Sequence, residues 1–248
     1  MAHHGPGDVT FFALDAHQPV LAAHRAQGKR VVFTDDGDIV AQKGKQIFRI
    51  PLANVPLTRQ GQIGFQTENV MAAVAAAWAV NVPWDAIAQG LSTFISDIQG
   101  VPGRFNVFDY QGATLIADYG HNPDAIQALV QAVDNMPAKK RVVVISGAGD
   151  RRDQDIRDQT EILGAAFDDV LLYQDACQRG RADGEVLKLL REGLQGAKRT
   201  SHVEDIQGEF NAIDKALARL SDGDLCLILI DQVEEALAYI TEKVKAAT

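Results

Sequence analysis

The sequence has little of what several large protein classes require. Only two cysteines occur in 248 residues, Cys177 and Cys226, and neither has another Cys or His at zinc-ligand spacing. We therefore expect no disulfide, no metal site and a reducing, cytoplasmic setting, with Cys226 as a buried small hydrophobic residue. No apolar run reaches the length of a membrane span, and residues 1–7 are too polar for a secretory signal.

Positive charge is also scarce. The chain carries 24 Lys and Arg against 33 Asp and Glu, a net charge of −9, and it has no dense basic block. Because neutralising phosphates requires clustered Lys and Arg, nucleic acid is excluded as the main partner, whereas a small cationic substrate is not. The hydrophobic content of 46% is enough for a sizeable core.

Two nucleotide-binding signatures are missing. Gly44-Lys45 lacks the upstream Gly of G-x-x-x-x-G-K and a following Ser or Thr, so the chain holds no P-loop. Gly147-Ala148-Gly149 follows an apolar strand but lacks the third glycine of a dinucleotide fingerprint, and no acidic residue ends the next strand. A nicotinamide cofactor is therefore not expected.

Hydrophobic periodicity divides the chain into two parts. Residues 9–50 read as short strands around one helix, 51–64 as a loop, and 67–80 as an alanine-rich helix with Asn69 in its first turn. A boundary falls in 96–102, which has Gly, Pro and no periodicity. Beyond it strands and helices alternate, which predicts a doubly wound, mostly parallel, Rossmann-like α/β sheet. The expected helices are 19–27, 67–80, 83–94, 123–133, 154–167, 184–194, 208–220 and 232–245, and 202–203 is expected to be a short strand.

The segment 114–133 is the centre of the prediction. It reads as a strand, the polar loop Asp118-Tyr119-Gly120-His121-Asn122, and a helix that begins at Pro123 with Asn122 as its N-cap. Polar groups between a strand's carboxyl end and a helix N-terminus lie where open α/β sheets bind ligands. The residues alone leave the alternatives open that His121 is a hydrogen-bonded loop histidine and that Asp118 caps a turn.

Two more loops are expected to converge with 118–122 at this edge, namely 147–153 and 175–181. Loop 147–153 brings Asp150, Arg151, Arg152 and Asp153 together. A solvated helix start explains the aspartates, but two arginines at the positive end of a helix favour an anionic ligand. The segment 179–181, Arg-Gly-Arg, is either a mobile binding loop or solvated surface. Asp231 and Gln232 lie at the end of the last strand, where sheet geometry again favours a ligand, but residue chemistry assigns them no role.

The sequence resembles the Mur-type amide ligases. The resemblance rests on D-Y-G-H-N-P at 118–123, P-G-R-F at 102–105 and G-A-G-D-R-R-D at 147–153, three motifs in the family's order. It covers nearly the whole chain. Together with R-G-R at 179–181 and I-D-Q-V at 230–233, it is strongest with the branch that joins arginine to the aspartate side chains of a poly-aspartate backbone, giving cyanophycin.

The resemblance implies a fold, ligands and residue roles. Residues 1–100 would be the end of a central ATPase domain and 101–248 the C-terminal lid domain. A carboxylate would be activated by ATP with Mg²⁺ as an acyl phosphate and attacked by the amine of arginine. The implied residues are Asn69, Arg104, Asp118 and Asn122 for the nucleotide, Gly149, Asp150 and Arg152 for the substrate, and His121, Arg151 and Asp153 for catalysis. A capping or exposed Asn69 and a surface salt bridge of Arg104 are the plain alternatives.

Several expectations concern the rest of such an enzyme. The P-loop and the Mg²⁺ ligands would lie in a preceding segment, so the chain is expected to need the missing N-terminal part of the same enzyme and to be inactive alone. The complete enzyme is expected to be a cytoplasmic homo-oligomer. The alternatives are another Mur-type ligase acting on peptidoglycan precursors or folate, a non-catalytic binding module, and a free-standing flavodoxin-like domain, which leaves the three motifs unexplained.

Overall fold

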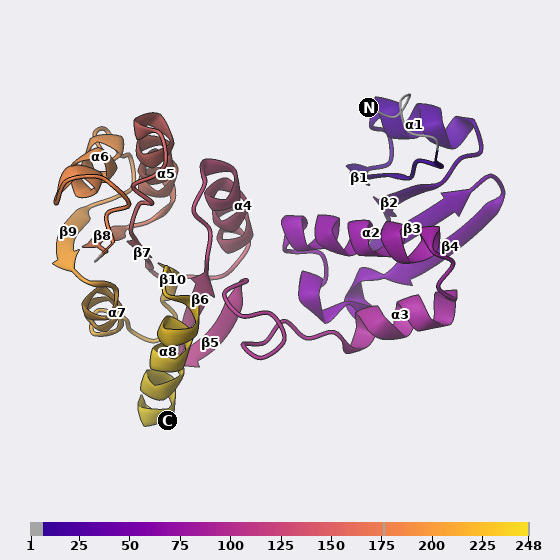
Figure 1. Cartoon of the computed structure of the whole chain (residues 1–248). Coiled ribbons are helices and arrows are strands. Elements are labelled where there is room, and N and C mark those ends of the chain that lie inside the picture. The colour runs from indigo at the N-terminus through magenta and orange to yellow at the C-terminus, as the bar shows by residue number, and fades with distance from the viewer. Residues whose placement is uncertain (1–6, 176, 248) are drawn as a thin grey trace. The chain divides into compact units, whose positions relative to one another are not determined.

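The computed structural model describes residues 7–175 and 177–247. The chain divides into two compact units, one up to Ile95 and one from Ser96 onward, both drawn in Figure 1. Among the described residues, no helix is both long and apolar enough to cross a membrane. Each unit is described by itself.

The N-terminal unit is a four-stranded sheet packed against helices. Its strands lie in the order β1-β2-β3-β4, with β1 parallel to β2 and the other pairs antiparallel. The apolar side of the long helix α2 and of α3 packs on β2, β3 and β4 in one buried cluster. The bounds are β1 Phe11–Asp15, α1 Pro19–Ala26, β2 Val31–Asp35, β3 Asp38–Lys43, β4 Gln46–Pro51, α2 Gly64–Ala79 and α3 Trp84–Thr93.

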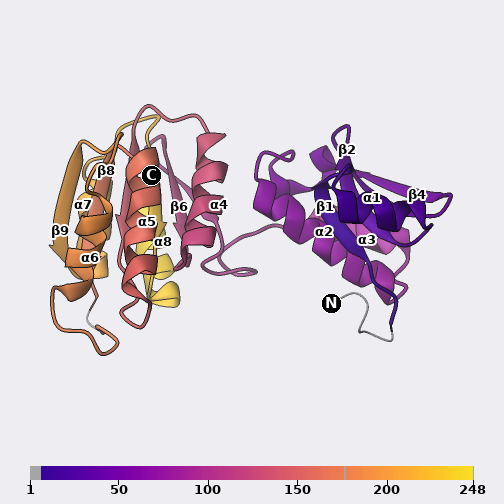
Figure 2. The ribbon, with the colours of Figure 1, turned by 90° about the horizontal axis from the view of Figure 1, so that it is seen from above.

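The C-terminal unit is a six-stranded sheet with helices on both faces. Its strand order is β5-β6-β10-β7-β8-β9, and all neighbours are parallel except β5 with β6. Figures 1 and 2 show α4, α5 and α6 side by side on one face and α7 and α8 on the other. The bounds are β5 Asn106–Tyr110, β6 Ala113–Asp118, α4 Pro123–Asp134, β7 Arg141–Ile145, α5 Asp153–Ala166, β8 Asp169–Gln174, α6 Glu185–Gly193, β9 His202–Gln207, α7 Glu209–Leu217, β10 Leu225–Leu229 and α8 Val233–Ala247.

The continuous apolar runs of the central strands explain this layering. Successive side chains of a strand point to opposite faces, so a strand covered on both faces needs apolar residues at every position. In β7, Val142 and Val144 belong to the cluster beneath α7 and α8, while Val143 and Ile145 are equally buried outside it. The predicted doubly wound, mostly parallel sheet is therefore confirmed.

Three local predictions need correction. The helix α2 begins at Gly64, not at residue 67, because Gln66 and Thr67 are buried and the Thr67 hydroxyl donates to the Ile63 carbonyl at 3.2 Å. Asn69 is consequently in the second turn of α2, not in the first. The segment 51–64 contains two short 3₁₀ turns. The strand expected at 202–203 extends to Gln207, because every residue of β9 pairs with β8.

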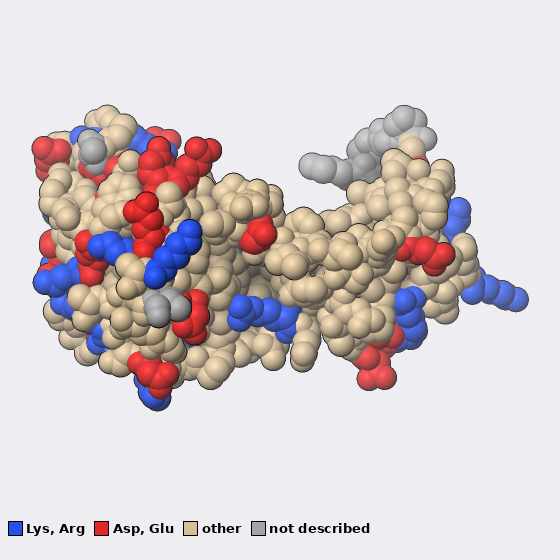
Figure 3. Space-filling view, turned by 90° about the horizontal axis from the view of Figure 1, so that it is seen from below, with Lys and Arg blue, Asp and Glu red and all other residues tan. Residues whose placement is uncertain are grey.

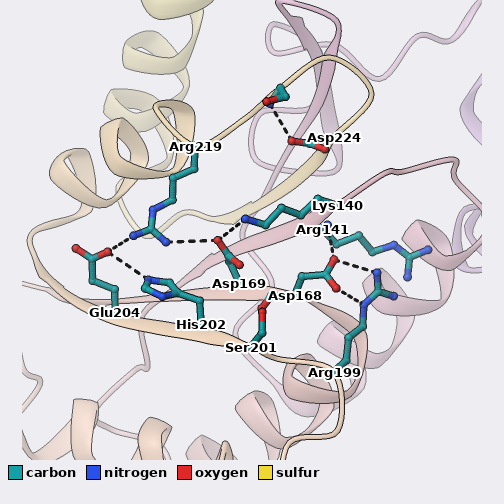
Figure 4. Close-up of polar contacts among 11 residues, drawn as sticks. Lys140, Arg141, Asp168, Asp169, Arg199, Ser201, His202, Glu204, Arg219 and Asp224 are labelled. Carbon is teal, nitrogen blue, oxygen red and sulfur yellow. Dashed lines mark hydrogen bonds and ion pairs between the residues drawn. The ribbon is translucent and has the colours of Figure 1, made fainter.

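Charged side chains are interspersed over the C-terminal unit. Figure 3 shows acidic and basic groups mixed on the face that it presents. At the edge where β7, β8 and β9 begin, they form the network of Figure 4. Its centre is Asp169, whose side chain is 5% exposed and lies 2.7 Å from Lys140 Nζ and 3.4 Å from Arg219 Nη1. Arg219, two residues beyond the end of α7, also pairs with Glu204, and its two ion pairs connect this segment to β8 and β9.

Replacing Asp169 by asparagine is expected to lower the free energy of unfolding by about 2 kcal/mol, because two cations lose a buried carboxylate. The matched control is Asp222→Asn, since Asp222 pairs with Lys139 while 81% of its side chain is exposed; we expect a change below about 0.5 kcal/mol there. Chemical denaturation followed by far-UV circular dichroism measures both. Equal effects of the two substitutions would contradict the central position of Asp169.

Candidate functional site

Four loops lie together at the carboxyl ends of the parallel strands. They are 118–122 at the end of β6, 146–152 after β7, residues 175 and 177–184 after β8, and 230–232 after β10. Side chains connect them: His121 with Asp231, Arg179 with both Asp231 and Asp150, and Arg181 with Gly149. The predicted convergence of loops 118–122, 147–153 and 175–181 is confirmed, and the loop after β10 joins them. We call these four segments the loop cluster.

The motifs at 102–105 and 118–122 form one interlocked turn. Phe105 N–H donates to Asp118 Oδ2 at 2.8 Å, and Tyr119 N–H donates to the Gly103 carbonyl at 2.9 Å. Gly103 has φ +69°, and a Cβ there would lie 2.8 Å from Val233, so this position requires glycine. Arg104 projects from the turn as an exposed side chain, with its guanidinium carbon 5.8 Å from the centre of the Tyr119 ring.

Asp118 is a buried carboxylate with few partners. Its residue exposure is 7%, and burial raises its pKa from 3.8 to about 6, against the Phe105 N–H bond and the charges of Arg104 and His121, which lower it. A folded pKa above the unfolded one means that the folded state binds more protons between about pH 4 and pH 6. Stability contributed by this group is therefore lost as the pH rises through that window, by at most about 3 kcal/mol.

Asp118→Asn is accordingly expected to raise the melting temperature at pH 8 relative to the wild type, because asparagine still accepts from Phe105 N–H and carries no buried charge. The advantage should shrink by about 2 kcal/mol at pH 4.5, where the wild-type carboxyl is mostly protonated. Thermal melts at both pH values measure the difference. The exposed Asp124→Asn is the control for the loss of one negative charge, and a gain for Asp118→Asn that is the same at both pH values would contradict the assignment.

His121 lies between the loops after β6 and β10. Its side chain is 10% exposed, and Nε2 is 3.3 Å from Asp231 Oδ1. The Tyr119 ring packs against the imidazole at 4.3 Å. Nδ1 is buried and has no hydrogen-bond partner among the described residues. The imidazole is thus oriented from one side by a carboxylate and keeps one nitrogen for another group. The next residue, Asn122, is the predicted N-cap of α4: its side chain accepts from Ala125 N–H at 2.8 Å, and Pro123 follows as the first helical residue.

The side chain of Arg181 holds loop 147–153 in place. Arg181 donates to the carbonyls of Gly149 and Arg151, each at 2.7 Å, and its guanidinium lies 2.9 Å from Asp153. A Cβ at Gly149 would lie 2.1 Å from the Gln178 carbonyl oxygen, so glycine is required for the close approach of two loops. With 16% of its side chain exposed, Arg181 is not solvated surface, so that interpretation of segment 179–181 is wrong for this residue, and a mobile binding loop stays a prediction.

The remaining predicted residues are placed as follows. Arg152 makes a bidentate pair with Asp155 at 2.6 and 2.9 Å while 84% of its side chain is exposed, so an ion pair at spacing three accounts for it locally. Arg151 and Asp150 are exposed. Asn69 is an exposed residue of the N-terminal unit, and its amide donates to Gln66 Oε1 at 3.2 Å.

Sequence reasoning missed the centre of the loop cluster, which is Asp231. Its carboxylate contacts His121 and Arg179, and its backbone N–H donates to Glu209 Oε1 at 2.8 Å. The hydrogen bond with His121 is the largest reason why the pKa of Asp231 lies below its usual value, and burial opposes it. Burial raises the pKa of Glu209, which also accepts from Gln232 N–H. The one signal available was the position of Asp231 at the end of a buried strand.

Ligand chemistry at this edge is suited to anions and cations alike, since guanidinium, imidazole and carboxylate groups meet there. Among the described residues, no group of three or more His, Cys, Asp or Glu side chains is arranged to hold a metal ion.

Comparisons with known proteins agree on one superfamily. The model of the Mur ligase, glutamate ligase domain matches residues 103–229. A cyanophycin synthetase of Crocosphaera subtropica is 31% identical over 244 residues, which are 98% of this chain and 28% of that protein. The chain thus spans little more than a quarter of this relative.

Two further comparisons extend the likeness. A UDP-N-acetylmuramoyl-L-alanyl-D-glutamate–2,6-diaminopimelate ligase of Alkaliphilus metalliredigens is 31% identical over 165 residues, 66% of this chain and 32% of that protein. The structure of E. coli FolC in complex with DHPP and ADP aligns with a TM-score of 0.63 and 21% identity, covering 97% of this chain and 54% of FolC. At that identity the last comparison concerns the fold.

Proposed function

Because this chain belongs to the Mur ligase family, as its motifs predicted, we propose that it is the C-terminal part of an ATP-dependent amide ligase that forms cyanophycin. The reaction joins arginine to the aspartate side chains of a poly-aspartate backbone. The observation that carries the proposal is the likeness to cyanophycin synthetases, which extends over 97–98% of the chain, whereas the likeness to a diaminopimelate ligase extends over 66%.

The proposal divides the chain by role. Residues 1–100 are the end of the central ATPase domain and 101–248 the lid domain. ATP transfers its γ-phosphoryl group to the aspartate carboxylate, which releases ADP and gives an acyl phosphate. The arginine amine then attacks this acyl phosphate, so that phosphate leaves and the amide forms. Asn69 contacts the adenine of ATP. Arg104, Asp118 and Asn122 also belong to the nucleotide-binding residues.

The other side of the loop cluster serves the reaction with the amine. His121 is oriented by Asp231 and moves a proton at Nε2 or Nδ1 as the amide forms. Arg151 and Asp153 act beside it, and Gly149, Asp150 and Arg152 line the substrate side. Positive groups placed where charge develops on the acyl phosphate or the tetrahedral intermediate lower the barrier.

The test is ATP-dependent incorporation of labelled arginine into poly-aspartate. The complete ligase is assembled by joining this chain to the N-terminal part of the Crocosphaera enzyme, and the 248-residue chain alone is the control. We expect incorporation by the complete ligase and neither incorporation nor ATP hydrolysis by the chain alone, since it has no P-loop.

Three outcomes contradict the proposal. Turnover by the chain alone refutes its dependence on the N-terminal part. A complete ligase that accepts diaminopimelate or glutamate in preference to arginine favours a different Mur-type ligase. No heat of binding with either ATP or arginine, together with an inactive complete ligase, favours a non-catalytic binding module.

A further inference from the structure

A guanidinium group of the chain itself occupies the loop cluster. Arg179 Nη2 lies 3.0 Å from Asp231 Oδ1, and Nη1 lies 3.7 Å from Asp150 Oδ1. The same guanidinium is hydrogen-bonded to the side chain of Tyr119. Only 32% of the Arg179 side chain is exposed. A planar cation is thus held by carboxylates from the loops after β7 and β10.

Asp231 is suited to bind a cation by its burial and by a neighbouring carboxyl group, in addition to its contact with Arg179. Asp231 is 16% exposed in its side chain, and the side chain of Asp175, from the loop after β8, is hydrogen-bonded to it. Asp231 and Asp150 thus contact the Arg179 guanidinium, and Asp175 adds a third carboxyl group beside Asp231. A cation that contacts both Asp231 and Asp150 offsets the repulsion between these two carboxylates.

Buried polar atoms beside this cluster are not used by the chain. Among the described residues, His121 Nδ1 and Gln159 Oε1 are buried and have no hydrogen-bond partner. They belong to neighbouring groups, because Gln159 Nε2 donates to the His121 carbonyl at 3.4 Å. Gln159 is 1% exposed and the His121 side chain 10%. Buried polar atoms are normally paired, so these two atoms are unsatisfied hydrogen-bonding groups beside the cluster.

Arg179 is attached more loosely than its neighbour Arg181. Its backbone has φ +50°, a strained conformation for a residue other than glycine, and Gly180 follows with φ +93° and open space around it. Arg181, in contrast, is fixed by two backbone carbonyls and two carboxylates. Arg179 can therefore leave without releasing the rest of the loop.

We propose that Asp231, Asp150 and Asp175 form the seat for the guanidinium of the incoming arginine, and that Arg179 is a placeholder which yields this seat to the substrate. The inference rests on the proposed function and names the residues that read the side chain. Exchanging one guanidinium for another leaves the charge of the cluster unchanged, so no buried carboxylate is left unpaired during binding. A flat, forked cation fits several carboxylates better than an ammonium group does.

The experiment is calorimetric titration of the 248-residue chain with L-arginine. Arg179→Gln, which empties the seat, is expected to bind arginine at least about 10-fold more tightly than the wild type, because the internal competitor is gone. Asp231→Asn is expected to bind at least about 10-fold more weakly, and Asp150→Asn, at the exposed rim, about 3-fold more weakly. L-citrulline, the neutral analogue, should not bind, and L-lysine should bind more weakly than arginine.

The matched control is Arg191→Gln, which removes an arginine that pairs with Asp205 outside the loop cluster and should leave arginine binding unchanged. Circular dichroism melts identify any variant that does not fold. If Asp231→Asn does not fold, the exposed Asp150→Asn still tests the site. If Arg179→Gln binds L-arginine no more tightly than the wild type, Arg179 is not a placeholder. That result leaves the proposed function as an arginine-incorporating ligase unaffected. If no folded variant binds L-arginine, the three aspartates are not its binding site. The incorporation assay with the complete ligase then tests the proposed function independently.

Discussion

Replacing His121 by alanine is expected to lower kcat/KM for arginine incorporation by about 100-fold, the lower end of the range for general acid–base groups. The physical reason is its position: it lies beside the N-terminus of α4, its Nε2 is 3.3 Å from Asp231, and its Nδ1 is buried without a partner among the described residues. The assay is the incorporation reaction of the complete ligase, with ATP and arginine each varied.

A second His–carboxylate pair on the same unit provides the control. His202 Nε2 lies 3.5 Å from Glu204 Oε2 at the opposite edge of the sheet, where β9 begins, as Figure 4 shows. His202→Ala removes the same atoms and should change kcat/KM by less than about 2-fold. His121→Ala is expected to lower the free energy of unfolding by about 1–2 kcal/mol, because a buried side chain loses its contacts with Tyr119 and Asp231, although Asp231 keeps Arg179 as a partner. Circular dichroism melts check that the variant is folded in the assay. Equal kinetic effects of the two substitutions would show that His121 has no part in the reaction.

The substitution with the largest expected effect on folding is Gly149→Ala. Its Cβ would lie 2.1 Å from the carbonyl oxygen of Gln178, a backbone atom that cannot turn aside, so the loops 147–153 and 175–181 must separate. We expect a loss of about 3 kcal/mol in the free energy of unfolding together with near-complete loss of activity.

A glycine with free space around it gives the comparison. Gly90, inside α3, has no atom within 4 Å of a built Cβ and no positive φ, so Gly90→Ala should stabilise the chain by about 0.5–1 kcal/mol. Denaturant titrations of both variants, followed by circular dichroism, provide the two free energies. A Gly149→Ala variant as stable as the wild type would mean that the two loops do not touch in solution.

Features fixed by local chemistry were the ones that the sequence predicted. Asn122-Pro123 specifies a helix start through its own side chain and ring, and strands such as 141–145 specify burial on both faces through uninterrupted apolar residues. The strand β9 was underestimated because its residues are mostly half-exposed or exposed and polar, and its extended form comes from pairing with β8. Likewise the start of α2 was placed too late, because glycine is a poor helix former and the helix at Gly64 is supported by the tertiary burial of Gln66 and Thr67.

The centre of the loop cluster was not predictable from local patterns. Asp231 meets His121 only because β10, last in the chain, inserts between β6 and β7 in the sheet. That adjacency is a property of topology, and no spacing along the sequence encodes it. Arg152 shows the opposite case: its pairing with Asp155, three residues later, is local and was readable from spacing, but the sequence argument for an anionic ligand did not consider it. Its place on the substrate side stays a prediction.

The way Arg181 holds loop 147–153 has a practical consequence for redesign. Its guanidinium binds main-chain carbonyls at Gly149 and Arg151, and Gly149 in turn leaves space for the Gln178 carbonyl. The shape of either segment is therefore set by the other. An attempt to transplant the amino-acid preference of a related ligase should exchange 147–153 and 175–181 as a single cassette, since a graft of one alone would meet a mismatched backbone.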